Sequence, residues 1–552
     1  MKTYTNPVYP FVRPPDLDAP AGKRPVVVVG AGPVGLAAAI DLGQRGIPVV
    51  VLDDDRTVSV GSRAICYAKR ALEILDRLGC GQRVVDKGVG WHVGKVFFRD
   101  ELVFRFDLLP EPGHRRPAFV NLQQYWFEEY LVDRVRELEA IDLRWENKVV
   151  GVVPHADRVD VMVTTPDGDY TLACDWLVVC DGVRSPVRQL LGLDFEGQVF
   201  HDRFLIADIH MTSDFPTERW FWFDPPFHRD QSVLLHRQAD DVWRVDFQLG
   251  WDANPDEEKK PERILPRLRA MLGAKADFEI EWASVYTFQC RRMSRFRHGR
   301  VIFAGDAAHI VSPFGARGAN SGLQDADNLV WKLDLVMKAL APERLLDTYD
   351  AERTIAADEN LLNSTRSTDF ITPKSRVSRT FRDAVLGLAK KHAFARKLVN
   401  SGRLSVPAIL RTSPLNTRDR DPDFPRKPGA LMPGAPAADA PVRGPGSGED
   451  GAWLLGYLGG SFTLLGFGDA VGPHGVAALA RDRIACKVVQ VGGKPVAGAI
   501  FVDDVEGSAA RRYDARPGTV YLLRPDQHVC ARWREFDLPS VRTAIARATC
   551  NG

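Results

Sequence analysis

The sequence predicts an α/β protein built from several domains. At 552 residues the chain is too long for one hydrophobic core, so two or three domains are expected. Over Val26–Asp55 a buried-strand pattern, a glycine-rich turn and a helical pattern follow one another, which indicates a β-α-β unit. Between about residues 196 and 295 the chain is rich in alternating aromatic segments, which indicates an inserted β-rich region.

Composition argues against several classes of partner. Lys+Arg (73) and Asp+Glu (72) nearly cancel, so neither nucleic acid nor an acidic membrane surface is expected as a partner. The eight cysteines contain no CxxC pair and no metal-ligand cluster, which predicts reduced thiols, a cytoplasmic location and no metal site. Residues 1–25 lack the apolar core of a signal peptide, and no run of about 20 apolar residues predicts a membrane span.

The segment GAGPVG, Gly30–Gly35, is a GxGxxG turn in the context that binds dinucleotides. Its three glycines allow a tight turn, close approach of a pyrophosphate and close packing of the helix on the strand, and Pro33 and Val34 open that helix. A second copy, GSGEDG at residues 446–451, lies in a Pro/Gly-rich stretch with no strand before it and is interpreted as linker. Asp53 ends the second strand and is placed to accept hydrogen bonds from a ribose.

Hydrophobic periodicity gives the other expected elements. Helices are expected from the glycine-rich turn to Gly46, then over Arg63–Gly79, Gln124–Leu138 and Asp325–Leu340. Strands are expected at Val26–Val29, Val49–Leu52, near Val96–Phe106, at Val149–Val163, Tyr170–Val179, Trp220–Phe223, Ser232–Arg237, Val242–Leu249 and Arg300–Ala304, and in AWLLGYL, FTLLGF, ACKVVQV and TVYLLRP. These predict a discontinuous nucleotide-binding domain (1–195 and 296–412), a β-rich domain (196–295), a linker (413–449) and a C-terminal α/β domain (450–552).

Two later segments also combine a buried strand with a polar turn. CDGVRSPVR, Cys180–Arg188, carries Asp181 in its turn, with arginines nearby that suit phosphate, although alone it also fits an ordinary β-turn. In Arg300–Leu329 a strand leads to Gly305 and Asp306, and a glycine-containing loop then opens a helix. A carboxylate for a polyol hydroxyl and a helix N-terminus for an acceptor are what the ribityl chain and pyrimidine edge of a flavin need.

In this order and at these separations, GAGPVG, CDGVRSPVR and GDAAH with PFGARGAN resemble the three FAD-contact motifs of single-component flavoprotein aromatic hydroxylases. Within that group the chain is similar to the 3-(3-hydroxyphenyl)propionate hydroxylase type over almost its whole length. Its last hundred residues resemble the thioredoxin-like domain of the phenol hydroxylase branch. The resemblance implies an FAD-binding Rossmann-like domain with an inserted β-rich substrate domain and a C-terminal thioredoxin-like domain.

The same resemblance implies an activity. The expected enzyme is a monooxygenase that uses FAD, O2 and NADH or NADPH to hydroxylate a small phenolic substrate ortho or para to its hydroxyl through a flavin hydroperoxide. A homodimer is also expected, with the C-terminal domain in a structural role. That domain has no cysteine near its expected redox turn, Gly468–Gly475, so thiol-redox chemistry is not expected there.

The cofactor contacts that the resemblance implies fall on all three motifs. They are Gly30, Gly32, Pro33, Val34, Gly35 and Asp53 for the ADP half, Arg63 and Gln124 near pyrophosphate and ribityl, Asp181 for FAD and the visiting nicotinamide, Gly305 and Asp306 for ribityl, and Pro313, Gly318, Ala319 and Asn320 for the isoalloxazine. Asp53 stands where a glutamate is commoner in the family. Oxygen transfer is expected near Pro313.

The substrate residues are less specifically marked. A phenol has a pKa of about 10, so its ionisation at neutral pH needs roughly 4 kcal/mol and favours a positioned base. Tyr286 stands where the phenol hydroxylase branch has a substrate-contacting tyrosine, and its alternative is a core tyrosine. His236 as a proton relay and Arg244 as a carboxylate ligand have the same alternative of a structural residue. Trp222, in an aromatic run, is expected in the wall of the substrate pocket.

Two rival functions fit part of the pattern. Trp220–Pro225 has the WxWxxP spacing of flavin-dependent halogenases, for which Lys87 or Lys95 would supply the lysine. The stretch lacks the isoleucine before the proline, and those enzymes lack this C-terminal domain. A non-catalytic flavin-binding scaffold is the other alternative, but it leaves the loop at Pro313 without a purpose.

Overall fold

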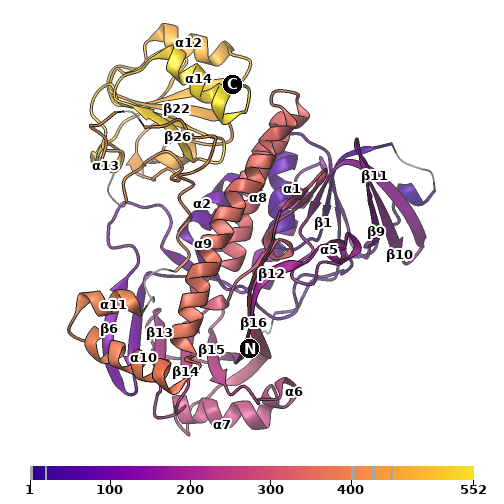
Figure 1. Ribbon diagram of the computed structural model, residues 1–552, viewed down its shortest axis with the longest axis vertical. Coiled ribbons are helices and arrows are strands. Elements are labelled where there is room, and N and C mark those ends of the chain that lie inside the picture. Colours follow the sequence, from indigo (N-terminus) through magenta and orange to yellow (C-terminus); the bar gives the residue numbers. More distant parts are fainter. Residues whose placement is uncertain (1–3, 19–21, 400–403, 420, 426–428, 449–451) are drawn as a thin grey trace. The chain divides into compact units, whose positions relative to one another are not determined.

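The computed structural model describes residues 4–18, 22–399, 404–419, 421–425, 429–448 and 452–552. The chain divides into two compact units. Unit 1 comprises Met1–Pro110, Pro117–Leu323 and Ala357–Val406, and unit 2 comprises Glu111–Arg116, Gln324–Ala356 and Pro407–Gly552. The long helices α8 (Gly318–Met337) and α9 (Asp347–Ile371) contribute residues to both units (Figure 1). The last residues of the second GxGxxG, 449–451, lie outside the described residues.

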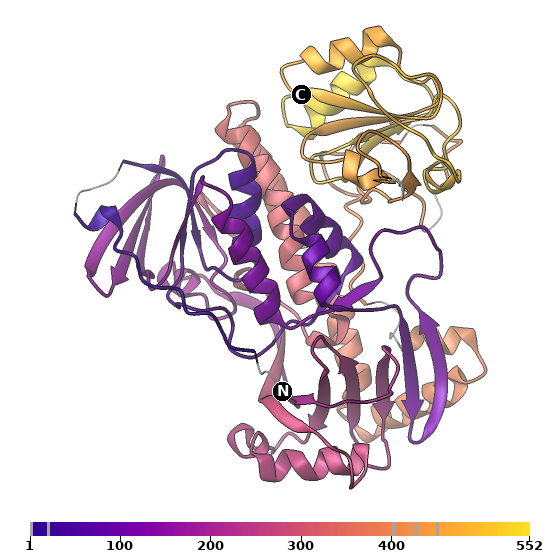
Figure 2. The same cartoon turned by 180° about the vertical axis from the view of Figure 1, so that it is seen from behind.

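The first sheet of unit 1 is the nucleotide-binding sheet, with β1 at its centre. The order along it is β17-β18-β11-β1-β2-β8, and β9 and β10 extend it through β11. The strands are β1 (Arg24–Val29), β2 (Val49–Leu52), β8 (Ile141–Arg144), β9 (Lys148–Pro154), β10 (Val159–Thr165), β11 (Gly168–Val179), β17 (Arg297–His298) and β18 (Val301–Phe303). Because β1 is parallel to both of its neighbours, its valines are buried on both faces. The helices α1 (Pro33–Gln44), α2 (Lys69–Leu78) and α4 (Gln124–Arg136) pack beside one another (Figure 2).

This topology brings the three sequence motifs to one edge. The parallel strands β1, β11 and β18 end at Val29, Val179 and Phe303, and each leads directly into one of the three turns. Ligands of open α/β sheets bind outside the carboxyl ends of the strands. The motifs, far apart in sequence, therefore converge where a dinucleotide is expected.

The second sheet of unit 1 is the substrate-domain sheet, with the order β19-β16-β12-β15-β14-β13-β5-β6. Its strands are β5 (Val93–Phe98), β6 (Glu101–Asp107), β12 (Phe195–His210), β13 (Arg219–Phe223), β14 (Ser232–Arg237), β15 (Val242–Leu249), β16 (Glu279–Met293) and β19 (His309–Ile310). One face packs against α7 (Pro261–Leu272), and the other packs against Phe314 and the helices α10 (Arg376–Ala389) and α11 (Ala393–Leu398). The sequence did not predict that β5 and β6 join this sheet, since both precede the β-rich segment.

The smaller elements of unit 1 are three short strands and three short helices. They are β3 (Cys66–Ala68), β4 (Val89–Trp91) and β7 (Phe119–Asn121), which form a three-stranded sheet, and α3 (Gly81–Lys87), α5 (Pro186–Leu190) and α6 (Pro255–Glu258). The helix expected over Arg63–Gly79 begins only at Lys69. Residues 66–68 pair with β7 instead, so tertiary pairing overrides the helical pattern there.

The C-terminal part of unit 2 is a five-stranded mixed sheet of order β24-β23-β22-β25-β26 with helices around it. Its elements are β22 (Phe462–Phe467), β23 (Cys486–Val491), β24 (Ile500–Val502), β25 (Val520–Leu523), β26 (Val529–Trp533), α12 (Pro473–Arg481), α13 (Ser508–Arg512) and α14 (Leu538–Ala548), beside the short strands β20 (Pro441–Val442) and β21 (Ala452–Trp453). The strand expected in AWLLGYL is wrong after Trp453, because a 3₁₀ turn follows.

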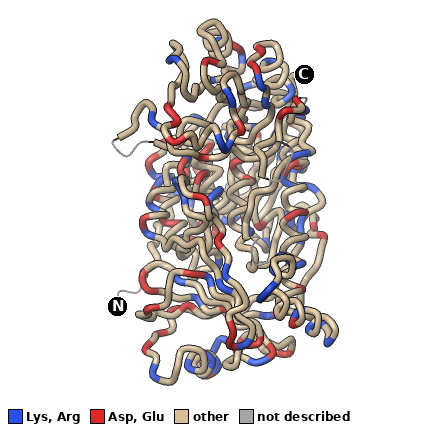
Figure 3. The backbone as a smooth tube through the Cα atoms, turned by 90° about the vertical axis from the view of Figure 1, so that its left-hand side faces the viewer, with Lys and Arg blue, Asp and Glu red and all other residues tan. Residues whose placement is uncertain are grey.

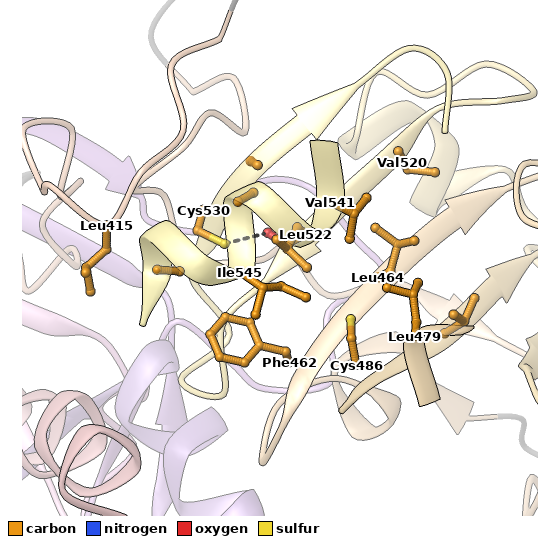
Figure 4. Close-up of a cluster of buried hydrophobic side chains, with 14 of the residues drawn as sticks. Leu415, Phe462, Leu464, Leu479, Cys486, Val520, Leu522, Cys530, Val541 and Ile545 are labelled. Atoms are coloured by element: carbon orange, nitrogen blue, oxygen red, sulfur yellow. Dashed lines mark hydrogen bonds between the residues drawn. The ribbon is translucent and has the colours of Figure 1, made fainter. Parts of the chain in front are cut away.

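The segment expected as a linker is packed against this sheet. Its Phe424, Ala440 and Val442 belong to one buried cluster with residues of β22 and β23. On the other face, Cys486 and Cys530 lie among leucines and valines, where the Cys530 thiol donates to the Leu522 carbonyl at 3.5 Å (Figure 4). The fold class is confirmed, but the boundaries of the two units differ from the expected domains.

Charge and hydropathy of the described residues are unremarkable. Acidic and basic residues are interspersed along the backbone (Figure 3). Among the described residues, no helix combines the length and hydropathy that crossing a membrane requires. No group of three His, Cys, Asp or Glu side chains in the described part of the chain is arranged to hold a metal ion.

Candidate functional site

The first turn is packed backbone against backbone. Gly30 has φ 101°, and a Cβ there would lie 2.5 Å from the Cys180 carbonyl oxygen. A Cβ on Gly35 would lie 1.9 Å from the Gly30 carbonyl oxygen. Both positions therefore require glycine, for the turn and for the close approach of α1 respectively.

The start of α1 is open toward a ligand. Gly32 is its N-cap, provides no side-chain cap, and has no atom within 4 Å of the place a Cβ would take. The uncapped N–H groups of the first turn carry partial positive charge, which suits a phosphate. Asp53 lies beside this turn, where it accepts from the backbone N–H of Ala31 at 2.5 Å and of Asp55 at 2.9 Å. Burial raises the pKa of Asp53 to about 6.

The second turn leaves one carboxylate oxygen without a partner. Oδ2 of Asp181 accepts from the Val187 N–H at 3.1 Å, whereas its buried Oδ1 has no hydrogen-bond partner among the described residues. Burial raises the pKa of Asp181 to about 6. Arg188, expected to meet phosphate, is instead buried and donates to the Ala307 carbonyl at 2.9 Å, so it ties the second turn to the third.

The third turn packs on the start of α1. A Cβ on Gly305, whose φ is 62°, would lie 2.9 Å from Val34, and a Cβ on Gly322 of α8 would lie 2.5 Å from the same side chain. The starts of two helices and the exposed Asp306 therefore meet in one place. Gly322 was missed from the sequence, although the small residues Ser321 and Gly322 ahead of Leu323 were a usable signal.

Two of the remaining expected cofactor contacts, Gln124 and Asn320, are already hydrogen-bonded within the protein. Gln124 accepts from the Ala64 N–H at 2.9 Å and donates to the Ser59 hydroxyl at 2.9 Å, so it holds the loop that carries the exposed Arg63. Asn320 is buried, and its amide bonds the backbone of Ala68, Cys66 and Ala316. Asn320 thus fixes the loop.

The loop ahead of α8 leaves its other expected contacts accessible. Pro313 is exposed, and Gly318 and Ala319 are half-buried. Pro313 opens a short 3₁₀ turn, Pro313–Gly315, that also contains Phe314. Phe314 packs against Phe204 and Phe288 of the substrate-domain sheet, with ring centroids 4.9 Å apart in each pair. The loop that is expected to meet the isoalloxazine is therefore seated on that sheet.

The face of this sheet that carries Phe314 holds the expected substrate residues. The half-buried Tyr286 makes no hydrogen bond to the described residues, and burial raises the pKa of its hydroxyl, which also feels the charges of Arg63 and Asp306. His236 is buried, with Nε2 4.0 Å from Oδ2 of Asp246. Burial lowers the pKa of His236 well below its usual value, so its ring is neutral at pH 7.

Two expected substrate contacts are corrected. Trp222 packs with the cluster on the α7 face, whereas its neighbours Phe221 and Phe223 lie on the Phe314 face, because strand residues alternate. Arg244 is already occupied. It donates to Asp208 at 2.8 and 2.7 Å and to the Arg63 carbonyl at 3.1 Å.

The sequence interpretation missed two polar residues on this face, Arg219 and Asp246. Oδ1 of Asp246 is buried without a partner among the described residues, and burial raises the pKa of its carboxyl to about 6. Arg219 is two residues from Phe221 on β13, and Asp246 is two residues from Arg244 on β15. Because alternate strand residues share a face, this spacing could have placed both residues on the Phe314 face. The lysines considered for a halogenase are both paired, Lys87 with Asp240 at 2.6 Å and Lys95 with Glu218 at 2.7 Å.

The three turns fit an FAD. The open start of α1 suits the pyrophosphate, the acid at the end of β2 suits the ribose, and the unpartnered Oδ1 of Asp181 requires a donor that the described residues do not supply. At Gly30 and Gly35 a Cβ would clash with the backbone of the turns, whereas the place of a Cβ on Gly32 is open and leaves room for a ligand.

Comparison with known proteins agrees with this fit. Residues 23–364 match the family described as FAD binding domain. The 12-dehydrotetracycline 5-monooxygenase/anhydrotetracycline 6-monooxygenase of Streptomyces rimosus is 33% identical over 416 residues, 72% of this chain and 80% of the relative. The 3-(3-hydroxy-phenyl)propionate/3-hydroxycinnamic acid hydroxylase of Mycolicibacterium smegmatis is 25% identical over 95% of this chain and 93% of the relative.

The fold is shared with solved structures. The flavin-dependent monooxygenase PieE, solved with FAD and substrate, superposes with a TM-score of 0.82 at 23% identity and covers 97% of this chain and 100% of its own. The family match spans well over half of the chain and includes all three turns. The chain therefore belongs to the FAD binding domain family and is an FAD-dependent monooxygenase.

Proposed function

We propose that this protein hydroxylates a small phenolic substrate ortho or para to its hydroxyl group, with O2 and with NADH or NADPH as the electron donor. One observation carries the proposal. The Tyr286 hydroxyl lies without a hydrogen-bond partner on a sheet face that also carries the Phe314 loop, under the influence of Arg63 and Asp306. A half-buried hydroxyl in such a place is ready to bond a substrate oxygen.

FAD, when bound, supplies the activation of oxygen and its transfer to the ring. The residues that would hold it are those of the three turns, from Gly30–Gly35 through Asp181 to Asp306. Pro313 and Gly318 border the exposed side of the loop, where the reactive edge of the cofactor would lie. Asp181, with its free oxygen, is also proposed to meet the nicotinamide donor.

Tyr286 would act on the oxygen of the substrate. A raised pKa keeps its own proton at neutral pH, so its hydroxyl donates to the substrate and favours the phenolate. The positive charges of Arg63 and Arg244 act in the same direction, because each favours an anionic oxygen nearby. Together they would contribute to the roughly 4 kcal/mol that full ionisation of a phenol requires at pH 7.

His236 is the second group proposed to move a proton. Its neutral ring has one acceptor nitrogen; Nδ1 lies 4.0 Å from the Cys66 sulfur, and the Asp246 carboxylate 4.0 Å from Nε2 would stabilise the protonated ring. The name of the hydroxyphenylpropionate relative supports a phenolic substrate, because this chain aligns with almost all of that protein. The paired states of Lys87 and Lys95 give the halogenase alternative no support.

The experiment is a screen of NADH and NADPH oxidation by the purified protein against phenols, with products identified by mass. We expect a yellow protein with one FAD per chain, oxidation stimulated by phenols and products heavier by one oxygen atom. Asp306→Ala should lose flavin. A colourless protein that FAD does not reconstitute, or a requirement for a separate reductase, would refute the proposal.

We also propose that the protein is a homodimer in which the C-terminal domain has a structural role. The structural role is supported by the described thiols of that domain, because burial raises the pKa of Cys530 to about 12 and also raises the pKa of Cys486 and Cys550. The dimer is carried over from the family resemblance. The mass of the particle in solution by light scattering tests the dimer directly. A mass near 61.4 kDa at all concentrations would contradict it.

A further inference from the structure

Arg219, the first residue of β13, is a buried cation with no anionic partner in the described part of the chain. Only 7% of the Arg219 surface is exposed. One guanidinium nitrogen, Nη2, donates to the Phe314 carbonyl at 3.2 Å, while Nη1 is buried with no hydrogen-bond partner among the described residues. No described carboxylate lies within 4.0 Å of the guanidinium, and burial lowers the pKa of Arg219.

A second arginine on the same face, Arg244, has its guanidinium fully paired and serves as a comparison. Arg244 donates twice to Asp208, and this carboxylate keeps the pKa of Arg244 above its usual value although burial opposes the charge. Burying a cation without a partner is costly, and proteins normally supply an anion or several acceptors. The contrast indicates that the partner of Arg219 comes from outside the chain.

The surroundings of Arg219 show what kind of partner fits. It lines a narrow cavity together with Phe221, Phe223 and Phe314, and with Ile371 and Ser367 of α9. Three aromatic rings suit an aromatic ligand. The other charged side chain in the lining is the cation Lys95, so no carboxylate in this lining competes for the guanidinium.

We propose that Arg219 binds the carboxylate of the substrate, so that the natural substrate is a phenolic acid. The inference rests on the proposed function and names its substrate class. The ring of the acid would lie against Phe221 and Phe223. The planar guanidinium of Arg219 would pair with the carboxylate through Nη1, which has no partner among the described residues. Since Arg219 also holds the Phe314 carbonyl, the acid would be anchored beside the loop that borders the cofactor.

The test compares matched acids and alcohols on the FAD-loaded protein. The probes are 3-(3-hydroxyphenyl)propionate against 3-(3-hydroxyphenyl)propan-1-ol, and 3-hydroxybenzoate against 3-hydroxybenzyl alcohol. Binding is read from the change in flavin absorbance. In the wild type at least one acid should bind more tightly than its alcohol. Arg219→Met should weaken that acid about 10- to 100-fold, as expected for a hydrogen bond to a charged group, and leave the alcohol unchanged.

Two further variants separate binding from folding. Arg219→Lys, which keeps the charge, should retain part of the preference for the acid. Arg237→Met removes a half-buried arginine of β14 that is paired with Asp241 at 3.1 Å, and it should leave both affinities unchanged. The melting temperature of Arg219→Met should equal or exceed that of the wild type, because the variant no longer buries an unpaired cation.

Three results would overturn the inference. They are the absence of any preference for an acid in the wild type, equal weakening of acid and alcohol in Arg219→Met, and a lower melting temperature with the preference unchanged. The last would make Arg219 only a support for the Phe314 loop. If neutral phenols are hydroxylated while acids are not preferred, the proposed function stands and this inference fails.

Discussion

Two buried polar regions of this protein are built on opposite plans. In unit 1, three polar groups on the sheet face that carries Phe314 have no hydrogen-bond partner among the described residues. They are Nη1 of Arg219, Oδ1 of Asp246 and the Tyr286 hydroxyl. In unit 2, Lys332, Glu352, Arg524 and Asp526 are fully buried, and each has a charged partner within 2.7 Å.

The contrast separates structure from function. Glu352 receives Lys332 at 2.7 Å, Arg524 at 2.5 Å and the Ser413 hydroxyl at 2.5 Å, so its charge is fully compensated. Such a network joins α8, α9 and the C-terminal sheet within unit 2 and does not need a ligand. The polar groups on the sheet face in unit 1, like Oδ1 of Asp181, lack hydrogen-bond partners among the described residues. A bound molecule would supply those partners.

The largest expected effect is the loss of a member of the complete network. Glu352→Gln removes the anion between two buried cations, so we expect the free energy of unfolding to fall by about 3–5 kcal/mol. Denaturant or thermal unfolding measures this. Glu343→Gln, at an exposed position, is the control and should change stability little. An equal effect of the two variants would mean that the network is not structural.

The corresponding change in the incomplete region should affect turnover and not stability. Tyr286→Phe should keep its FAD and slow hydroxylation at least 100-fold, the lower range for a general acid–base group. Consumption of NAD(P)H should continue, with hydrogen peroxide as the product. The measurement is the ratio of hydroxylated product to peroxide, with Tyr130→Phe on α4 as the control. An unchanged ratio and rate would exclude Tyr286 and turn attention to His236.

A pH effect distinguishes the regions further. Burial raises the pKa of Asp246 from 3.8 to about 6, so the folded protein binds its proton more tightly than the unfolded chain does. Stability from this group is therefore present below about pH 4 and is lost as the pH rises to about 6. The change in unfolding free energy caused by Asp246→Asn should therefore be more stabilising at pH 7.5 than at pH 4.5, by about 2–3 kcal/mol. Equal effects of the substitution at both pH values would contradict a buried, unpartnered carboxylate.

The smallest expected effect concerns the cysteines of unit 2. Replacement of Cys486, Cys530 and Cys550 by serine should leave turnover unchanged, because burial raises the pKa of all three thiols and disfavours thiolate chemistry. Stability should fall modestly, since Cys486 and Cys530 lie in an apolar cluster. A large loss of turnover in a folded variant would indicate the redox role that the sequence argues against.

The sequence predicted the turns far better than the sheet face. The turns that carry Gly30, Asp181 and Asp306 were predicted because each follows a buried strand, and parallel strands present their ends at one edge. The pairing of Arg244 with Asp208 was not visible, because it depends on the register of β12 and β15, whose residues are far apart in sequence. On this face Arg244 is paired with Asp208, whereas Arg219 has no carboxylate partner among the described residues.

Local patterns also failed where tertiary contacts decide. The helical periodicity of Arg63–Gly79 is real, yet Cys66–Ala68 forms a strand because β7 and the Asn320 amide pair with its backbone. The Pro/Gly-rich segment before residue 450 reads as a linker, but its Phe424 and Val442 are buried against the C-terminal sheet. In both cases the deciding partner lies more than 20 residues away and leaves no local signal.

The most direct test of the account is the source of the inserted oxygen. The FAD-loaded protein is given NADH or NADPH and a phenol or phenolic acid under ¹⁸O2, and the product is analysed by mass spectrometry. The account predicts one ¹⁸O atom on the ring, ortho or para to the hydroxyl, without a second protein. Oxygen derived from water, incorporation of chloride, or NAD(P)H consumption that yields only peroxide with every phenol would contradict it.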